Sequence, residues 1–368
     1  MSKLKETVGK VKDAINKADE KIREVEKKVK ESDKAKEIKQ KIEQSEIYEK
    51  VMENITQDPF YRVKKQIYDK IKFYDTIIIH RHNRPGGDCL GSSFGLRDIL
   101  QTSFPEKKVY SVGSDKAEYL SFLGEEDSVE SSSYEHALVI VLDTGNSDRI
   151  SDKNYQLGQE IIKIDHHVAV EDYGDINYVR EEMPSTTTII MDFFNTFKRD
   201  LKMTKYGAQC LYVGTITDTG RFRYRSVTGK TLRLAGDMLD YGFDTEALFA
   251  HLTIKEKETL KLQGYVLNRF KTTENGVSYI YLSKRLQKKF NVSLEEASSL
   301  VNSLDNIKGS MIWLLFIEAD DVIRVRLRSR YTSVLEIAQA YNGGGHRQAS
   351  GASVQNKKEI KQLVKDAD

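Results

Sequence analysis

Four short apolar runs rich in β-branched residues constrain the fold of this 368-residue chain more than any other feature. They span 75–79, 108–112, 137–142 and 161–164, without the polar alternation of a half-exposed strand. Continuous apolar strands are typical of parallel sheets that are buried on both faces. The segments between them, such as 91–102, are long enough for crossover helices. We therefore predict an α/β fold with a doubly wound, mainly parallel sheet that binds ligands at the carboxyl ends of its strands.

A second, smaller α/β domain is predicted in the C-terminal part of the chain. An apolar run at 277–282 follows a turn signal, and the runs at 311–318 and 322–327 flank a short acidic turn. A helical stretch at about 230–267 has few turn signals and resembles a connector. We expect a first domain at 57–235, a helical linker at 236–265 and a second domain at 266–368.

Residues 1–56 have the composition of a helical, coiled-coil-like extension. Between residues 4 and 29, apolar side chains recur every three or four residues, which is a heptad seam. Such a helix can self-associate or dock a partner, pack on its own globular domain, or lie on a membrane surface. We favour self-association or partner docking, and we place the membrane last because the small Val/Ala stripe lacks Trp and Phe anchors.

Composition narrows the class of protein. The 58 Lys and Arg residues nearly balance the 56 Asp and Glu residues, and the net charge of +2 disfavours long duplex DNA as a partner. The two cysteines cannot build a disulfide framework, and the charged N-terminus is unlike a signal peptide, so we expect a cytoplasmic protein. The longest apolar run, 311–317, is far shorter than the ~20 residues that a transmembrane helix needs.

Residues suited to metal binding or acid–base chemistry follow several apolar runs. They are His82, Asp88, Asp143, Asp165, His166, His167 and Asp218. Each one alone would more often be a helix cap or an ordinary polar contact, but strand ends bring them to one edge of one sheet. Burying that much charge uncompensated is costly, so a metal site is the simplest explanation. Asp/His ligation without cysteine suits Mn²⁺, Mg²⁺ or Fe²⁺, and bridging carboxylates indicate a binuclear site for phosphoryl displacement.

The second domain contains a candidate phosphate site. The glycines of the sequence NGGGH at 342–346 expose backbone N–H groups and allow positive φ, as a phosphate or nucleotide cradle requires. A flexible turn is the alternative. Arginines at 324, 326, 328 and 330 alternate along a predicted strand, so they share one face. That face could bind phosphate or be solvated, and we favour phosphate binding for Arg328.

These motifs resemble a known family. Asp165-His166-His167, with His82-x-x-Pro85-x-x-Asp88, Asp143 and Asp218, resembles the DHH phosphoesterase superfamily. The sequence GGGHRQASG at 343–351 is similar to its DHHA1 substrate domain, and the motifs cover about residues 60–368. Within the superfamily, the chain most resembles the bacterial bifunctional oligoribonucleases, or nanoRNases. That resemblance implies Mn²⁺-dependent hydrolysis of short RNA oligonucleotides to mononucleotides, and of 3′-phosphoadenosine 5′-phosphate (adenosine 3′,5′-bisphosphate, PAP) to AMP.

The resemblance also implies roles for individual residues. One ion would be held by His82 and Asp143, and the other by Asp88, Asp143, His166 and Asp218, with Asp143 as the bridge. Asp165 would orient His166, and His167 would lie against the scissile phosphate. The far phosphate and base would contact Arg328, Ser329, Gly344, Gly345, His346 and Ser350.

One residue departs from the family pattern, which has an aspartate four residues after the first histidine where this chain has Gly86. The first ion then loses a carboxylate, so we predict slower hydrolysis than in a Gly86→Asp variant. Two alternatives stay open. One is a linear or cyclic di-adenylate phosphodiesterase of the same superfamily. The other is a non-catalytic nucleotide-binding scaffold that recruits a partner through residues 4–29.

Overall fold

The computed structural model describes residues 58–368, and the predicted extension at 1–56, with its seam at 4–29, lies outside them. The chain divides into two units between Lys70 and Ile71, and the second unit, 71–368, contains two β-sheets. Helix α4 (Tyr61–Phe73) precedes the first sheet in the sequence. Within the described residues, we find no helix that is both long and apolar enough to span a membrane.

The first sheet confirms the predicted α/β fold. Its strands are β1 (Thr76–Arg81), β2 (Lys108–Ser111), β3 (Leu138–Leu142), β4 (Glu160–Asp165) and β5 (Ile176–Val179). They pair in parallel in the order β2-β1-β3-β4-β5. The strand order reverses between β1 and β3, and ligands bind at such a switch point in folds of this kind. The sequence does not predict β5, because only one of its four residues is buried.

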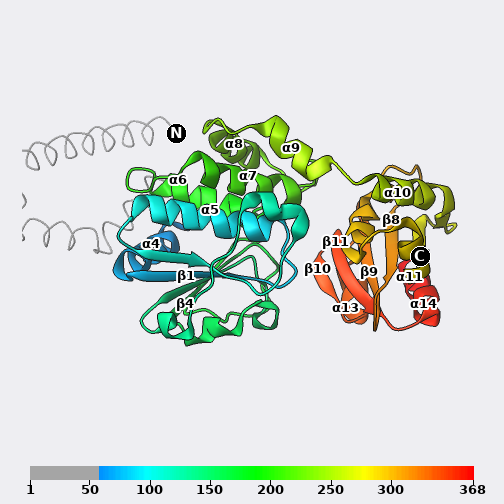
Figure 1. Cartoon of the computed structure of the whole chain (residues 1–368), viewed down its shortest axis with the longest axis horizontal. Helices are drawn as coiled ribbons and strands as arrows, with labels where there is room; N and C mark the ends of the chain where they lie inside the picture. Colours follow the sequence, from blue (N-terminus) through cyan, green and yellow to red (C-terminus); the bar gives the residue numbers. More distant parts are fainter. Residues whose placement is uncertain (1–57) are drawn as a thin grey trace, which may run out of the picture. The chain divides into compact units, whose positions relative to one another are not determined.

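Helices cover one side of this sheet, as Figure 1 shows. They are α5 (Gly87–Ser103), α6 (Thr186–Thr196), α7 (Lys205–Asp218) and α8 (Gly229–Leu239). Helix α5 is the predicted crossover between β1 and β2, and it begins directly after Gly86. It packs closely on α7 at Gly91, where a Cβ atom would lie only 2.4 Å from the carbonyl oxygen of Cys210. The glycine therefore permits this close packing of the two helices.

Short 3₁₀ turns cover the opposite face, where the sequence analysis predicted crossover helices. The turns η2 (Ser131–Tyr134) and η4 (Lys153–Leu157) contact each other there. Their buried tyrosines, Tyr134 and Tyr155, belong to one apolar cluster with side chains of β1 and β3. Because both faces are covered, every residue of β3 is buried. This burial explains the continuous apolar runs in the sequence.

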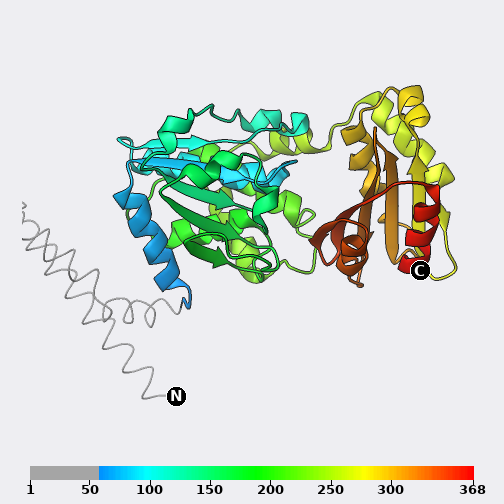
Figure 2. The ribbon, with the colours of Figure 1, turned by 90° about the horizontal axis from the view of Figure 1, so that it is seen from below.

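The second sheet has six strands in the order β10-β11-β9-β8-β7-β6, and all neighbours are antiparallel except β7 and β8. The strands are β6 (Lys271–Thr272), β7 (Val277–Leu282), β8 (Ile312–Glu318), β9 (Ile323–Ser329), β10 (Gly344–His346) and β11 (Ala349–Val354). Helix α14 (Lys357–Ala367), red in Figure 2, packs against β7 and β8. Helices α9 (Thr245–Thr253) and α10 (Lys257–Arg269) connect the two sheets in the sequence, within the predicted helical stretch.

Strand β9 places a row of arginines on one face of the second sheet. Its apolar residues Ile323, Val325 and Leu327 are buried, while Arg324, Arg326 and Arg328 are partly exposed on the other face, as predicted. The remaining short elements are η1 (Glu118–Leu123), η3 (Ser147–Arg149), α11 (Lys284–Phe290), α12 (Leu294–Ser298), η5 (Ser299–Leu304) and α13 (Leu335–Ala340).

Candidate active site

Acidic and imidazole side chains converge at the carboxyl ends of the first sheet. His82 follows β1, Asp143 follows β3, and His166 and His167 follow β4. Asp88 comes from the first turn of α5. Asp218 is the last residue of helix α7, so the prediction that it follows a strand is wrong. A buried helix and a buried strand produce similar apolar runs, which explains the difference.

Three carboxylates surround the imidazole of His166. Its Nε2 atom lies 3.7 Å from Asp88 Oδ2, 3.4 Å from Asp143 Oδ1 and 3.3 Å from Asp218 Oδ2. Its Nδ1 atom faces the backbone oxygen of Met183 at 3.3 Å, which leaves Nε2 directed at the carboxylates. These four side chains can therefore act as ligands of one ion.

Asp143 links this group to a second one. Its Oδ2 atom lies 3.4 Å from His82 Nε2, while its Oδ1 atom faces His166. The other ring nitrogen of His82 contacts the backbone oxygen of Asn83 at 2.6 Å, which fixes the ring. The ligand atoms of His82, Cys89 and Asp143 all lie within 4.8 Å of one another. Cys89 is not among the residues predicted from the sequence, although it directly follows Asp88.

The buried carboxylates attract positive charge. Burial and the neighbouring carboxylates of Asp143 and Asp218 raise the pKa of Asp88 to about 8. Burial alone would lower the pKa of His166, but the surrounding carboxylates raise it to about 10. A divalent cation would supply the same positive charge in place of protons. Together with the oxygen and nitrogen donors, this charge balance shows that the residues present fit a divalent metal ion.

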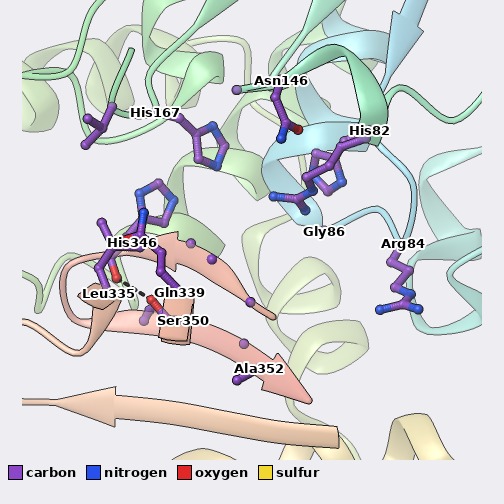
Figure 3. Close-up of a pocket in the computed structure, with 18 of the residues that line it drawn as sticks. His82, Arg84, Gly86, Asn146, His167, Leu335, Gln339, His346, Ser350 and Ala352 are labelled. Atoms are coloured by element: carbon purple, nitrogen blue, oxygen red, sulfur yellow. Dashed lines mark hydrogen bonds between the residues drawn. The ribbon is translucent and has the colours of Figure 1, made fainter. Parts of the chain in front are cut away.

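Asp165 orients His167. Its Oδ1 atom accepts a 2.7 Å hydrogen bond from Nδ1 of His167 and a 2.9 Å bond from the backbone N–H of His166. The resemblance implied that Asp165 orients His166, but the ring of that residue faces Met183 instead. His346 of the second sheet stacks on His167, with ring centroids 4.6 Å apart (Figure 3). Burial and the adjacent imidazoles lower the pKa of His346 to about 3, so its ring is uncharged at neutral pH.

The ligand cluster opens into a cleft of about 640 Å³ that both sheets line. Its opposite wall carries Arg324, Arg326 and Arg328. Burial and the neighbouring guanidinium groups lower the pKa of Arg326 to about 10. Within residues 58–368, these three arginines form no salt bridge with a carboxylate. The cleft therefore has an acidic wall suited to cations and a basic wall suited to anions.

The glycine-rich segment of this wall is a strand and not the predicted loop. Residues Gly344–His346 form β10, which pairs with β11 at the edge of the second sheet. A Cβ atom on Gly343 would lie 2.0 Å from the carbonyl oxygen of Gly351, and Gly345 has φ of +136°. Both positions therefore require glycine for the backbone to pack at this edge.

Of the predicted substrate residues, Arg328, Gly344, Gly345, His346 and Ser350 line this cleft. Ser329 does not, because it lines a second cavity of about 790 Å³, and its hydroxyl donates to the carbonyl of Thr332. The residues that line both cavities are His166, Val168, Asp218, Arg328, His346 and Ala349. The ligand cluster therefore lies where the two cavities meet.

Gly86 lies on the cleft wall near His82 (Figure 3). Its backbone is extended, with φ of −96° and ψ of −176°, which any residue can adopt. A Cβ atom at this position would have no heavy atom of the described chain within 4 Å. An aspartate can therefore replace Gly86 without clash or strain.

We expect Mn²⁺ to stabilise the protein through this cluster. An ion present at 100 times its dissociation constant stabilises the folded state by about 2.7 kcal/mol, or roughly 5 °C in melting temperature. The Asp88→Asn variant should lose most of this shift, because Asp88 lies in the buried cluster. Asp148→Asn, at an exposed position, should keep it. Thermal melts with Mn²⁺ and with EDTA measure the effect, and an equal shift in both variants would contradict the site.

Comparison with known proteins identifies the family. The model of the DHH family N-terminal domain matches residues 76–215, and the DHHA1 domain model matches 276–368. The bifunctional oligoribonuclease and PAP phosphatase NrnA of Bacillus subtilis is 39% identical over 305 residues, covering 83% of this chain and 97% of the relative. The chain belongs to the DHH phosphoesterase family. Its members are metal-dependent hydrolases, which agrees with the ligand cluster.

Further relatives of this DHH phosphoesterase support the assignment. The probable bifunctional oligoribonuclease and PAP phosphatase NrnA of Streptococcus mutans is 43% identical over 290 residues, covering 78% of this chain and 93% of the relative. The crystal structure of an exopolyphosphatase-related protein from Bacteroides fragilis superposes with a TM-score of 0.75 at 25% identity. That similarity covers 83% of this chain and 96% of the other, so the overall architecture is shared.

Proposed function

We propose that this DHH phosphoesterase hydrolyses short oligoribonucleotides to mononucleotides and removes the 3′-phosphate of PAP to give AMP. The observation that carries the proposal is the cleft with a carboxylate cluster on one wall and an arginine row on the other. A short polyanion bound there can meet metal ions at one phosphate and guanidinium groups at the next. The names of the relatives from Bacillus subtilis and Streptococcus mutans support these substrates. Because both substrates are intracellular nucleotides, we place the activity in the cytoplasm.

The proposed ions are two Mn²⁺, with Mg²⁺ or Fe²⁺ as chemically suitable substitutes. The proposed ligands are His82 and Asp143 for one ion, and Asp88, Asp143, His166 and Asp218 for the other. When bound, such a pair of ions activates water and stabilises the leaving oxygen of a phosphate ester. Asp143 contacts both imidazoles through different oxygens, so its position sets the spacing between the two halves of the site.

The chain's own residues then orient the substrate. Nδ1 of His167 is bound to Asp165, so only its Nε2 atom can contact a phosphate oxygen. The uncharged His346 ring stacks on His167 and limits the room beside it. Nη1 of Arg328 donates to the backbone oxygens of Leu327 and Ser350, at 2.9 and 3.3 Å, which leaves Nε and Nη2 for a phosphate.

The two cavities support a short oligonucleotide as substrate. They meet at the ligand cluster, so nucleotides on either side of the scissile phosphate can each occupy one cavity. The second cavity is lined by the exposed Tyr331, and exposed aromatic side chains of this kind stack on bases. With one nucleotide in each cavity, the site favours substrates a few nucleotides long.

We expect Arg326→Ala to raise KM for an RNA dinucleotide by about 10- to 100-fold, with a smaller change in kcat. The loss of a charged hydrogen bond to phosphate costs about 1.5–3 kcal/mol. Arg285→Ala is the matched control, because Arg285 is an exposed arginine of α11 that lines neither cavity. Steady-state kinetics with the dinucleotide separate the two variants, and equal KM values would count against the arginine wall.

The proposed function is tested by comparing kcat/KM for an RNA dinucleotide, PAP, and linear and cyclic di-adenylate. We expect the RNA dinucleotide and PAP to be the preferred substrates. A clear preference for di-adenylate would assign the chain to that branch of the superfamily. Binding of all four without turnover, with every divalent ion tested, would support the nucleotide-binding scaffold.

A further inference from the structure

The His82 half of the metal centre contains a thiol. The ligand atoms of His82, Cys89 and Asp143 lie within 4.8 Å of one another, and their residues are only 8%, 0% and 4% exposed. Cys89 lies in the first turn of the 17-residue helix α5, immediately after Asp88. The same helix therefore directs a carboxylate and a sulfur atom to the metal centre.

Gly86, on the cleft wall near His82, offers no side-chain ligand to this half of the centre. Among the described residues, the group of potential ligands around His82 consists of Cys89 and Asp143, and Asp143 also faces His166. Without the thiol, His82 and the shared Asp143 are too few to hold a divalent ion firmly. Cys89 would complete a set of three protein ligands, which leaves an open position as in catalytic zinc sites.

We propose that Cys89 is a metal ligand and that the His82 half of the centre is a mixed nitrogen, oxygen and sulfur site. Such a site selects Zn²⁺ or Co²⁺ over Mn²⁺, because thiolate sulfur favours softer ions and oxygen donors favour Mn²⁺. The proposal rests on the metal centre of the proposed function, whose His82 half it assigns to Zn²⁺ or Co²⁺ in place of Mn²⁺, and it does not rest on the substrate. Binding releases the thiol proton to solvent, and sulfur and Asp143 then supply two negative charges to the divalent ion.

The geometry agrees with a tetrahedral site. Nitrogen and oxygen ligands at zinc bond lengths lie about 3.4 Å apart in a tetrahedron, and His82 Nε2 and Asp143 Oδ2 are 3.4 Å apart. Cys89 Sγ makes a long 3.8 Å contact with the backbone oxygen of His82, which a stronger metal bond can replace.

Cobalt titration of the full chain, freed of metal beforehand, tests the proposal. Co²⁺ bound to a thiolate gives an intense near-ultraviolet charge-transfer band, whereas Co²⁺ bound only to oxygen and nitrogen gives weak visible bands. We expect the charge-transfer band in the parent chain and in Cys210→Ala. Cys210 is the other buried free cysteine and belongs to α7, so it is the matched control. Cys89→Ala should lose the charge-transfer band and keep the visible bands of Co²⁺ at His166.

The outcomes distinguish the role of the Cys89 thiol from the role of the other ligands of the centre. Visible cobalt bands without charge transfer in the parent chain would overturn the role of Cys89 and leave the proposed function standing. The absence of all cobalt bands would overturn both. In competition, Zn²⁺ should displace Co²⁺ from the parent chain at lower concentration than Mn²⁺ does. The double variant Gly86→Asp/Cys89→Ala should shift this preference toward Mn²⁺, and an unchanged preference would contradict the proposal.

Discussion

Gly86→Asp is expected to raise Mn²⁺-dependent hydrolysis of an RNA dinucleotide by about 10- to 100-fold, the range associated with residues that tune a metal site. The new carboxylate would lie in open space on the cleft wall, near His82. It would give the first ion the oxygen ligand that Mn²⁺ prefers. The measurement is mononucleotide release at saturating Mn²⁺ for the parent chain and the variant.

Gly236→Asp is the matched control for that experiment. Gly236 lies in helix α8, a Cβ atom there has no described neighbour within 4 Å, and the residue does not line the cleft. Its replacement should leave the rate unchanged. Equal rates for Gly86→Asp and the parent chain would show that the lack of a carboxylate at position 86 does not limit Mn²⁺-dependent turnover.

Asp143→Asn is expected to reduce turnover by about 10²- to 10³-fold. Asp143 faces both His82 and His166, so its loss weakens both halves of the centre. Metal ions contribute several kcal/mol to transition-state stabilisation, and each ~1.4 kcal/mol corresponds to a factor of about ten in rate. Asparagine keeps the shape of the side chain, so we expect the variant to fold.

The control for Asp143→Asn is again Asp148→Asn, which changes an exposed carboxylate in the same region of the chain. Single-turnover rates with labelled RNA dinucleotide compare the two variants directly. Circular dichroism and thermal melts without metal establish that both are folded. A rate for Asp143→Asn close to that of the parent chain would contradict the bridging role.

The sequence predicts the first sheet well because its strands are buried on both faces. Runs such as 137–142 have no polar alternation, and β3 is buried along its whole length. Strand β5 has a single buried residue, so it leaves little hydrophobic signal. Asp218 was placed at the end of an apolar run that is in fact a buried helix, and local sequence does not separate these two cases.

The sequence predicts the ligand cluster less completely than the fold. The rule that parallel strands end at one edge of a sheet predicts that His82, Asp143 and His166 lie close together. In the structure, Asp143 contacts both imidazoles. The partner of Asp165 depended on ring orientation, which no sequence pattern encodes. Cys89 was not predicted as a ligand, because a single cysteine beside Asp88 is a weak sequence signal, and its proximity to His82 and Asp143 is seen in the structure.

The most direct test of the central claim is metal-dependent release of mononucleotides from a 5′-labelled RNA dinucleotide. The parent chain and Gly86→Asp would be assayed with Mn²⁺, Co²⁺, Zn²⁺ and EDTA. We predict nucleoside monophosphates in the presence of metal, none with EDTA, and faster release by Gly86→Asp in Mn²⁺. The absence of product from both proteins with every ion would contradict the assignment of this cleft as a phosphoesterase active site.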